Sequence, residues 1–361
     1  MTPTISRIDT RRVVVPLTRP WGPTVTSITV VTVDVYDSAG DVGHGFSWTP
    51  TIGGTAVHAM LDNDIVPWAV GREAEPTWWR AAWEHLHEAG GGGVTTIALA
   101  GLDLALWDLR CRRQSTGIDE LLGRRHDSQP AYGSGINLHY SCDELVDQAE
   151  RLTAAGCRAV KVKVGKPDLA EDAERVAAVR AAIGPTTGLM IDANQRWDLP
   201  ATLRALDALA GFDLEWLEEP IRADDLWAYR RLRKHSPVPI ALGENLHTIY
   251  RFRDFIEAEA VDIIQPNIIR VGGITPFRRI VELARSHSIK VMPHLLPELS
   301  GQLALTLAEP TLVEDVEDAS FERLGVLAGA SPVRVSNSRL TLTGHTGLGF
   351  SFAEKPALVS K

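Results

Sequence analysis

The sequence predicts an α/β barrel preceded by a smaller α+β unit, and two observations lead to this fold class. From about residue 130, short apolar runs alternate with stretches of helical spacing, which is typical of repeated βα units. The residues before that point lack this alternation and combine strand-like with helical segments. Seven or eight βα units predict a parallel sheet that closes into a barrel. The apolar runs are AVKVKVG, GLMIDAN, LEWLEEP, PIALGEN, DIIQPN, IKVMPH and TLVED.

The first part of the chain, residues 1–125, is expected to form the α+β unit. Residues 5–17 and 26–37 alternate apolar and polar side chains like antiparallel strands, and DSAGD is a turn sequence between strands. The helical patterns that follow cover residues 54–70, 75–88 and 94–113. Four glycines at 90–93 mark a break between the last two of these helices.

Residues 126–320 are expected to form the barrel. Each helical stretch there precedes an apolar strand candidate, as AEDAERVAAVRAAIG precedes GLMID. The alternative, an open doubly wound sheet, normally carries a glycine-rich phosphate loop after its first strand, and the sequence contains neither G-x-G-x-x-G nor G-x-x-x-x-G-K-[ST]. In the remainder, residues 321–361, RVSNSRLTLTGHTGLGF predicts a hairpin and a loop rather than another βα unit.

Composition and charge narrow the function classes. The chain has 361 residues, of which 44% are hydrophobic and 23% charged, and this suits a large core and two domains. A net charge of −9 without a long basic run argues against nucleic acid or an anionic membrane as a partner. No apolar run approaches the roughly 18 residues that span a bilayer and no signal peptide is recognisable, so we expect a cytoplasmic protein. Three cysteines without a CxxC pair argue against disulfides and zinc–thiolate sites.

Two lysines share one face of a predicted strand. In AVKVKV, the alternation of side chains places Lys161 and Lys163 on one face and the valines on the other. Two ammonium groups held close together repel each other, which favours the neutral form of one of them as a base near pH 7. The alternative is a pair of surface lysines on an edge strand, because short Lys/Val alternation is a weak signal.

Three carboxylates close successive apolar runs at a regular spacing. Asp192, Glu218 and Glu244 follow one another at equal steps of 26 residues, which suits one βα unit per step. Carboxylate oxygens from three adjacent strands are hard ligands, and they match a Mg²⁺ ion that keeps positions for water or substrate. Any one acid alone is typical of a solvated loop or a helix start. The neighbouring Glu219 would point the other way if the strand continued, so we expect it to face a helix or to support the ligands.

Six motifs, in their order along the chain, resemble the mandelate racemase group of the enolase superfamily (the mandelate racemase/muconate lactonizing enzyme family). The motifs are AVKVKVG, MIDANQRWD, WLEEP, ALGENLHT, QPNIIRVGGIT and VMPHLLPE. The resemblance covers nearly the whole chain, including GLDLALWDLRCRR at 101–113. It implies a modified TIM barrel, (β/α)7β, with an N-terminal α+β capping domain and a C-terminal segment that packs back on the cap.

The resemblance also implies the roles of the polar residues. The expected ligands of one Mg²⁺ ion per site are Asp192, Glu218 and Glu244. Lys163 would be the base on one face of the substrate, and His294 the acid or base on the opposite face.

Other residues of the series would serve the substrate. Lys161 would support the base and the substrate carboxylate, and Glu314 would hydrogen-bond that carboxylate. The remaining expected substrate-binding residues are Asn194, Trp21 in a loop at 18–25, Trp48 in a loop at 46–51, and His247. The two tryptophan loops would cover the barrel mouth and exclude water.

Asn267 departs from the family pattern. Many members have an Asp at this position that orients the histidine and gives it a charged partner, whereas QPN supplies Asn267 here. Asn can accept a hydrogen bond and fix the ring, but it carries no charge to stabilise imidazolium, so we expect His294 to be a weaker base. The hypothesis is that Lys163 abstracts the proton and His294 acts as an acid, which suits elimination better than two-base racemisation. The alternative is that Asn267 is a substitution without mechanistic meaning.

The implied chemistry is Mg-dependent abstraction of the proton alpha to a carboxylate, through an enediolate intermediate. We expect dehydration of an acid sugar to a 2-keto-3-deoxy acid, with a racemase or epimerase and an anhydro-sugar acid cycloisomerase as alternatives. A Schiff-base aldolase on the same barrel and a non-catalytic acid-sugar-binding protein are alternatives of other classes. The expected partner is a small carboxylate, and we expect a homo-oligomer.

Overall fold

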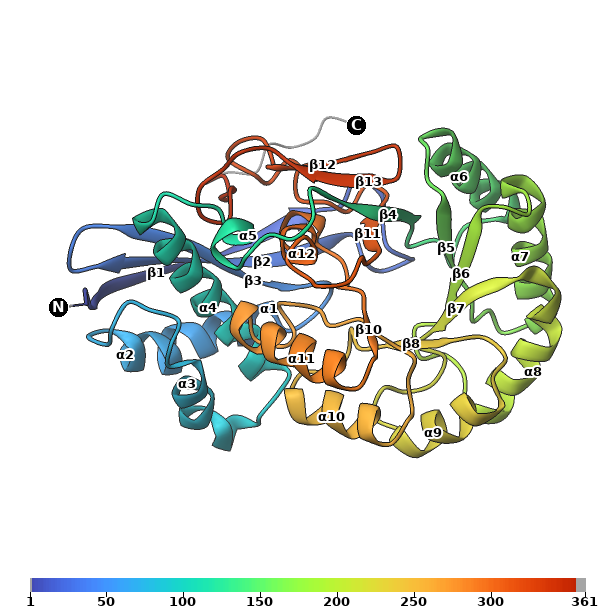
Figure 1. Cartoon of the computed structure of the whole chain (residues 1–361), viewed down its shortest axis with the longest axis horizontal. Helices are drawn as coiled ribbons and strands as arrows, with labels where there is room; N and C mark the ends of the chain where they lie inside the picture. The colour runs from blue at the N-terminus through green and yellow to red at the C-terminus, as the bar shows by residue number, and fades with distance from the viewer. Residues whose placement is uncertain (1, 355–361) are drawn as a thin grey trace.

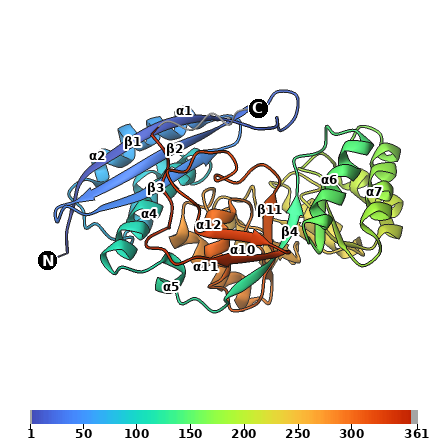
Figure 2. The ribbon, with the colours of Figure 1, turned by 90° about the horizontal axis from the view of Figure 1, so that it is seen from above.

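The computed structural model describes residues 2–354, which form two units, each built around its own sheet. In Figure 1 the N-terminal unit, in blue and teal, lies beside a ring of strands and helices that runs from green to orange. Seen from above in Figure 2, the N-terminal strands lie at one end of the molecule, and helices α6 (Cys142–Ala154) and α7 (Leu169–Ile183) lie at the other.

The N-terminal unit is a three-stranded antiparallel sheet with helices packed on it. Its strands pair in chain order and are β1 (Ile5–Pro16), β2 (Ser27–Asp37) and β3 (Val42–Thr49). Its helices are α1 (Gly54–Met60), a π-helical turn (Leu61–Ile65), α2 (Val66–Ala69), α3 (Trp79–His85), α4 (Val94–Arg113) and α5 (Ile118–Leu121). The predicted strands and helical stretches are present. The third strand was not predicted, and the expected loop at 46–51 is wrong in part because residues 46–49 belong to β3.

Two glycines explain why β3 is a poor strand by sequence and how it packs. A Cβ atom on Gly43 would lie 2.2 Å from the backbone oxygen of Ala105, and one on Gly45 would lie 2.2 Å from that of Gly101. Both oxygens belong to α4, so the glycines let this helix rest directly on the strand. Helix α4 is buried along almost its whole length because it lies between this sheet and the barrel helix α11 (Ile274–Ser286).

The second unit is a barrel of parallel strands connected by helices. Its strands are β4 (Ser128–Ser134), β5 (Ala159–Lys163), β6 (Gly188–Asp192), β7 (Leu214–Glu218), β8 (Ile240–Leu242), β9 (Ile263–Ile264), β10 (Lys290–Val291) and β11 (Val313–Val316). The helices between them are α6, α7, α8 (Leu199–Leu209), α9 (Leu226–His235), α10 (Ile249–Glu257), α11 and α12 (Pro297–Ala304). Seven βα units and a final strand confirm the predicted modified TIM barrel.

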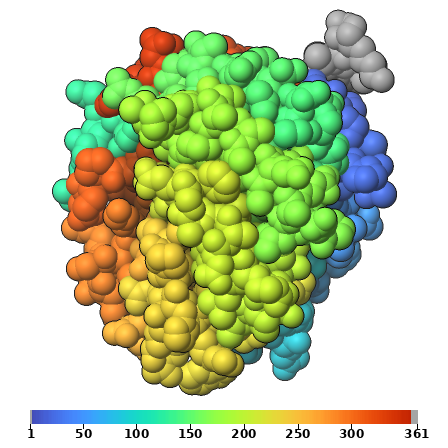
Figure 3. Space-filling model, turned by 90° about the vertical axis from the view of Figure 1, so that its right-hand side faces the viewer, coloured from blue at the N-terminus to red at the C-terminus, as the bar shows by residue number. Residues whose placement is uncertain are grey.

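The barrel helices begin where the sequence supplies an oxygen to cap them. Five of them have a side chain that accepts a hydrogen bond from a backbone N–H of the first turn, and this satisfies a donor without an intrahelical partner. The capping residues are Ser141, Asp168, Asp198, Asp225 and Thr248. Figure 3 shows one outer face of the molecule, where the green to yellow segments pack side by side.

The barrel closes through two kinds of contact. Strand β11 pairs with β4 in parallel, and β10 pairs with β9. Within residues 2–354 no backbone ladder joins β10 to β11; instead the hydroxyl of Thr311 donates to the backbone oxygen of Val291 at 2.5 Å. None of the helices in this range has the length and apolar content of a membrane span.

The C-terminal segment contacts both units. Strands β12 (Val333–Ser336) and β13 (Arg339–Leu342) form the predicted hairpin, and β13 pairs antiparallel with β4 of the barrel. Further along, the backbone N–H of Leu348 donates to Asp108 of α4 at 2.7 Å. The rings of Phe350 and Phe352 lie 5.9 and 5.2 Å from that of Phe46 in β3.

Candidate functional site

The strand register brings the polar series together at one edge of the barrel. Lys163 lies opposite Asp192 in the pairing of β5 with β6, and Asp192 lies opposite Glu218 in that of β6 with β7. Parallel strands present their carboxyl ends at the same side, where barrel enzymes carry their active sites. Of the other members, Glu244 follows β8, Asn267 follows β9, His294 follows β10, and Glu314 lies in β11.

Lys161 lies at the centre of a buried ion cluster. Its Nζ is 2.7 Å from Oε1 of Glu218, 2.8 Å from Oε1 of Glu314 and 3.8 Å from Oδ2 of Asp192. The side chain is 1% exposed, so these charges face one another without intervening solvent. Buried charges persist only when they are paired in this way.

Lys163 is the second cation of the site and is held at both ends. Its ammonium pairs with Oδ2 of Asp192. Its backbone N–H donates to Oδ1 of Asn137 at 2.8 Å, and the amide of Asn137 donates to Gln148 at 2.7 Å. The chain at the end of β5 is therefore fixed by a side chain from the loop after β4.

The expected lowering of a lysine pKa is wrong for the side chains as they stand. Burial works to lower the pKa of Lys163, but the carboxylate of Asp192 outweighs it and the pKa is raised. Burial likewise opposes the charge on Lys161, yet Glu218 and Glu314 raise its pKa well above the usual value. For Lys163, the attraction of Asp192 outweighs the repulsion from Lys161.

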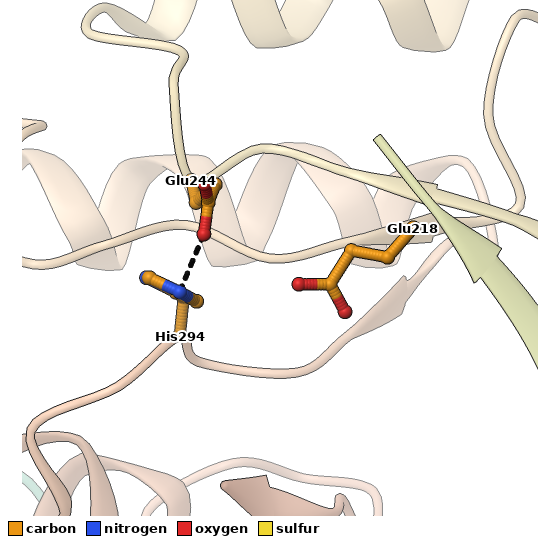
Figure 4. Close-up of side chains that lie close together, drawn as sticks. All are labelled: Glu218, Glu244 and His294. Atoms are coloured by element: carbon orange, nitrogen blue, oxygen red, sulfur yellow. Dashed lines mark ion pairs between the residues drawn. The ribbon is translucent and has the colours of Figure 1, made fainter. Parts of the chain in front are cut away.

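His294 completes the cluster from the opposite side of the barrel mouth. Its Nε2 lies 2.5 Å from Oε2 of Glu244, as Figure 4 shows, and 3.7 Å from Oε2 of Glu314. Burial works to lower the pKa of His294, but these two carboxylates raise it. The expectation of a weaker base is therefore wrong for this arrangement, since Glu244 and Glu314 provide the negative charge that Asn267 lacks.

Asn267 donates a hydrogen bond to His294 through its amide nitrogen, and its amide oxygen does not accept one from the ring. Its Oδ1 accepts hydrogen bonds from the backbone N–H groups of Ile269 and Arg270, each at 3.1 Å. This occupies the oxygen and turns Nδ2 toward Nδ1 of His294, 3.1 Å away. The expected hydrogen bond between the two residues exists, but its direction is reversed.

Each of the three predicted metal-ligand carboxylates faces a basic side chain: Asp192 faces both lysines, Glu218 faces Lys161, and Glu244 faces His294. Burial, together with Glu218 and Glu244, raises the pKa of Asp192 to about 6, although Lys163 lowers it. Buried acids that repel one another in this way favour a bound cation.

The donor set fits a hard divalent ion. One oxygen of Glu218 faces Lys161, and the other accepts from Gln265 at 2.7 Å and from the indole of Trp216 at 3.2 Å. Carboxylate oxygens fixed in this manner suit Mg²⁺. The atoms that already lie within 4.8 Å of one another belong to Glu218, Glu244 and His294. Asp192 stands outside this set because Lys163 holds one of its oxygens and the N–H of Asn194 holds the other, at 2.8 Å.

A ring of polar residues surrounds the buried cluster. Of these residues, only Glu219 was anticipated from the sequence. Oε2 of Glu219 accepts from Nε2 of Gln195 at 2.9 Å and from Nδ2 of Asn245 at 2.6 Å. Arg270 in turn donates to the amide oxygen of Asn245. Glu219 and Asn245 each come one position after a predicted ligand, Glu218 and Glu244, and that adjacency was the available signal. The ring joins four consecutive strand ends and supports the inner residues.

The other predicted substrate-binding residues differ in whether they contact the central cluster. Asn194 is next to the cluster, with a positive φ of 42° and its Nδ2 3.4 Å from Asp192. Trp21 and Trp48 pack together with ring centroids 6.4 Å apart, and Trp48 is only 3% exposed. His247 has Nδ1 3.2 Å from the backbone oxygen of Arg270. In the described part of the chain, no hydrogen bond or ion pair joins Trp21, Trp48 or His247 to the central cluster.

Together, the barrel, its cap and a cluster of buried carboxylates, lysines and a histidine define an enzyme of the enolase superfamily. Two family models match the chain: the mandelate racemase/muconate lactonizing enzyme N-terminal domain over residues 6–123, and the enolase C-terminal domain-like family over residues 144–355. The chain belongs to the mandelate racemase/muconate lactonizing enzyme family.

Similar proteins of known name catalyse different reactions. A 3,6-anhydro-α-L-galactonate cycloisomerase from Streptomyces coelicolor is 39% identical over 79% of this chain and 80% of its own. An L-talarate/galactarate dehydratase from Salmonella typhimurium is 31% identical over 92% of this chain and 82% of its own. The crystal structure of a racemase from Streptomyces coelicolor with bound magnesium has a TM-score of 0.91 and 34% identity, and covers 96% of this chain and 97% of that one.

Proposed function

We propose that the chain eliminates the β-oxygen of an acid sugar to give a 2-keto-3-deoxy acid, with water as the leaving group. The observation that carries this proposal is the direction of the Asn267–His294 hydrogen bond. A nitrogen of neutral imidazole that accepts a hydrogen bond carries no proton, so the ring proton lies on Nε2, the atom that faces the cluster. His294 is thus prepared to give a proton.

Lys163 is the abstracting base in this proposal. Asp192 raises the pKa of Lys163, so this role requires that a cation bound at the carboxylates offsets the charge of Asp192 and leaves the amine neutral. The neutral amine then takes the proton from C2, alpha to the carboxylate, and the C–H electron pair forms an enediolate. The enediolate collapses to a C2–C3 double bond as the C3–O bond breaks. His294 gives its Nε2 proton to the departing oxygen, and the enol product then tautomerises to the ketone by protonation at C3. In this step Lys163 gains one proton from the substrate, and His294 gives one proton to the leaving group.

Asp192, Glu218 and Glu244 hold one Mg²⁺ in this proposal, and the similar racemase structure from Streptomyces coelicolor contains bound magnesium. The bound ion neutralises the negative charge that builds on the substrate carboxylate. Lys161 contributes a fixed positive charge at the same place, because its raised pKa keeps it protonated. Glu314 acts on the substrate carboxylate through Lys161, with which it forms an ion pair. Asn194 contributes to substrate binding from the end of β6.

Ring opening of an anhydro acid sugar is the second candidate, and the 39% identity to a cycloisomerase favours it. In a 3,6-anhydro acid the oxygen on C3 belongs to a ring, so the same elimination opens the ring and releases no water. The two reactions share the base, the acid and the class of product. They differ in the substrate and in the change of mass.

A screen of aldonic, aldaric and anhydro-aldonic acids with Mg²⁺ tests the proposal. We expect a 2-keto-3-deoxy product that has lost the mass of one water, and loss of deuterium from C2 of a labelled substrate. A product of unchanged mass that contains the keto group selects the cycloisomerase, whereas inversion at C2 without a keto group selects a racemase or epimerase. Trapping of a substrate adduct by borohydride, with activity that survives chelation, would select the Schiff-base alternative. Binding without loss of deuterium would select the non-catalytic one.

A further inference from the structure

A cavity lies away from the strand ends, at the junction of the two units. It has a volume of about 750 Å³ and lies between α4 of the cap, the chain after α5, helix α11, and the residues that follow α12. Helices α4 and α11, which form two of its walls, contact each other directly (Figure 1). Small-molecule sites in proteins occupy roughly 300–1,000 Å³ and favour domain junctions, so the size and place suit a ligand.

The charge of this cavity is opposite to that of the chain. Its lining contains five arginines and one carboxylate, that of Glu282, in a protein with a net charge of −9. The arginines are Arg110, Arg125, Arg278, Arg279 and Arg285. This excess of positive charge at one junction is not matched by acids of the lining.

The ion pairs of these arginines leave most of the charge uncompensated. Arg285 pairs with Glu282 at 3.1 Å and with Glu309 at 3.5 Å, and Arg110 approaches Glu75 at 3.9 Å. Within residues 2–354, no ion pair involves Arg125, Arg278 or Arg279, although the charge of Arg279 lowers the pKa of the buried Asp103. Guanidinium groups remain charged at all physiological pH values, so this charge cannot be relieved by titration.

Two of the guanidinium groups, one from each unit, converge on a single indole. Arg110 of α4 lies 5.6 Å from the ring centroid of Trp107, and Arg278 of α11 lies 5.7 Å from it. The indole N–H donates to the hydroxyl of Thr275 at 2.9 Å, which fixes the ring. Like charges from the cap and the barrel are therefore held against one rigid side chain, where they repel each other.

We infer that this cavity binds a small polyanion, a molecule with two or more phosphate or carboxylate groups. Such a ligand would bridge Arg110 and Arg278 across the junction with charge-assisted hydrogen bonds. The site is separate from the proposed catalytic cluster, because none of its lining residues belongs to that cluster. It lies on α11, which directly follows the loop of Asn267 and Arg270, and so a ligand there contacts the element that leads out of the catalytic loop.

Titration calorimetry on the magnesium-loaded protein at constant ionic strength tests the site, with inorganic phosphate and tricarballylate as separate probes. We expect saturable binding of at least one probe, weakened about tenfold or more by Arg278→Glu, a change of about 1.4 kcal/mol. Arg204→Glu is the matched control, because Arg204 is an exposed residue on another barrel helix, α8. This control should bind within about twofold of the unchanged chain. The phosphate and carboxylate arms distinguish the two chemical sources of the ligand.

Four results would overturn the inference. The first is that neither probe binds saturably. The second is that Arg278→Glu and Arg204→Glu weaken binding equally, which would show that the attraction is a general charge effect. Binding that disappears with Glu218→Gln but persists with Arg278→Glu belongs to the barrel mouth. Self-association without probe that Arg278→Glu abolishes, measured by sedimentation, would show that the cavity faces a second copy of the chain. A thermal unfolding transition in each variant that matches that of the unchanged chain shows that the fold is intact.

Discussion

The amide nitrogen of Asn267 donates to Nδ1 of His294 over 3.1 Å, and the amide cannot reverse its direction. Reversal would take its oxygen away from the N–H groups of Ile269 and Arg270 and leave these donors unsatisfied. The backbone after β9 therefore determines which nitrogen of His294 carries the proton. An aspartate at this position would accept from Nδ1 and place the proton there instead.

Asn267→Asp should change the acid–base character of His294. We expect the carboxylate to raise the pKa of His294 further, because it stabilises imidazolium. The limb of the pH profile of kcat/KM that reports His294 should shift to higher pH. Exchange at C2 of both epimers in D₂O, followed by NMR, should become more equal. The control Asn267→Ala removes the donor without adding charge and should lower turnover without this shift. An unchanged profile for Asn267→Asp contradicts the role given to Asn267.

Lys161→Met should destabilise the metal-free protein more than the metal-loaded one. The substitution leaves the buried carboxylates of Glu218 and Glu314 without their cation, and breaking a buried pair in this way costs roughly 3–5 kcal/mol. Bound Mg²⁺ replaces part of the lost charge, so the difference should shrink when the ion is present. Urea unfolding with Mg²⁺ and with a chelator measures both values. An equal loss in the two conditions would show that the ion does not share the charge of this cluster.

Glu218→Gln should abolish magnesium-dependent turnover. The neutral amide is a weaker ligand for a hard cation, and we expect a loss of about 10²-fold or more in kcat/KM and in metal affinity. Glu215→Gln is a close control because Glu215 lies on the same strand but is exposed. Activity titrated with Mg²⁺ and metal binding by calorimetry measure the two effects. If both variants behave alike, Glu218 is not a ligand.

Much of the candidate site could be predicted because side chains at parallel strand ends must meet at one edge. Asp192 and Glu218 illustrate this, since each closes an apolar run and the strand register then places them side by side. The direction of the Asn267 amide could not be predicted, because it depends on two backbone N–H groups that return toward the side chain only in the folded loop.

The parts of the fold that escaped prediction depend on tertiary contacts. Strand β3 contains Gly43 and Gly45, which lower strand propensity but are required by the close approach of α4. The contacts of Glu219 follow from a backbone φ of 37°, which no strand pattern predicts. The pKa shifts of the lysines likewise depend on which carboxylate lies nearest, and that is a property of the assembled barrel.

Asp103 provides a test of the junction between cap and barrel. This buried residue of α4 accepts hydrogen bonds from the backbone N–H of Thr275 at 3.0 Å and from its hydroxyl at 2.5 Å. Thr275 lies in the first turn of α11, so a cap side chain satisfies donors at the start of a barrel helix. Burial raises the pKa of Asp103 to about 7, although the bonds to Thr275 lower it.

This raised pKa predicts that the protein loses stability as the pH rises. Between the unfolded value of about 4 and the folded value of about 7, the folded state binds the proton of Asp103 and the unfolded state does not. The contribution of Asp103 to the free energy of unfolding should therefore decrease across this range and stay constant above it. Asp103→Asn removes the titrating group, so we expect a flatter dependence of Tm on pH between about 4 and 7. Its lost hydrogen bond should lower stability by about 1–2 kcal/mol. Glu84→Gln on the exposed face of α3 is the control and should keep the slope of the unchanged chain. If Asp103→Asn also keeps that slope, Asp103 is ionised in the fold and the cap is joined to α11 by a charged carboxylate.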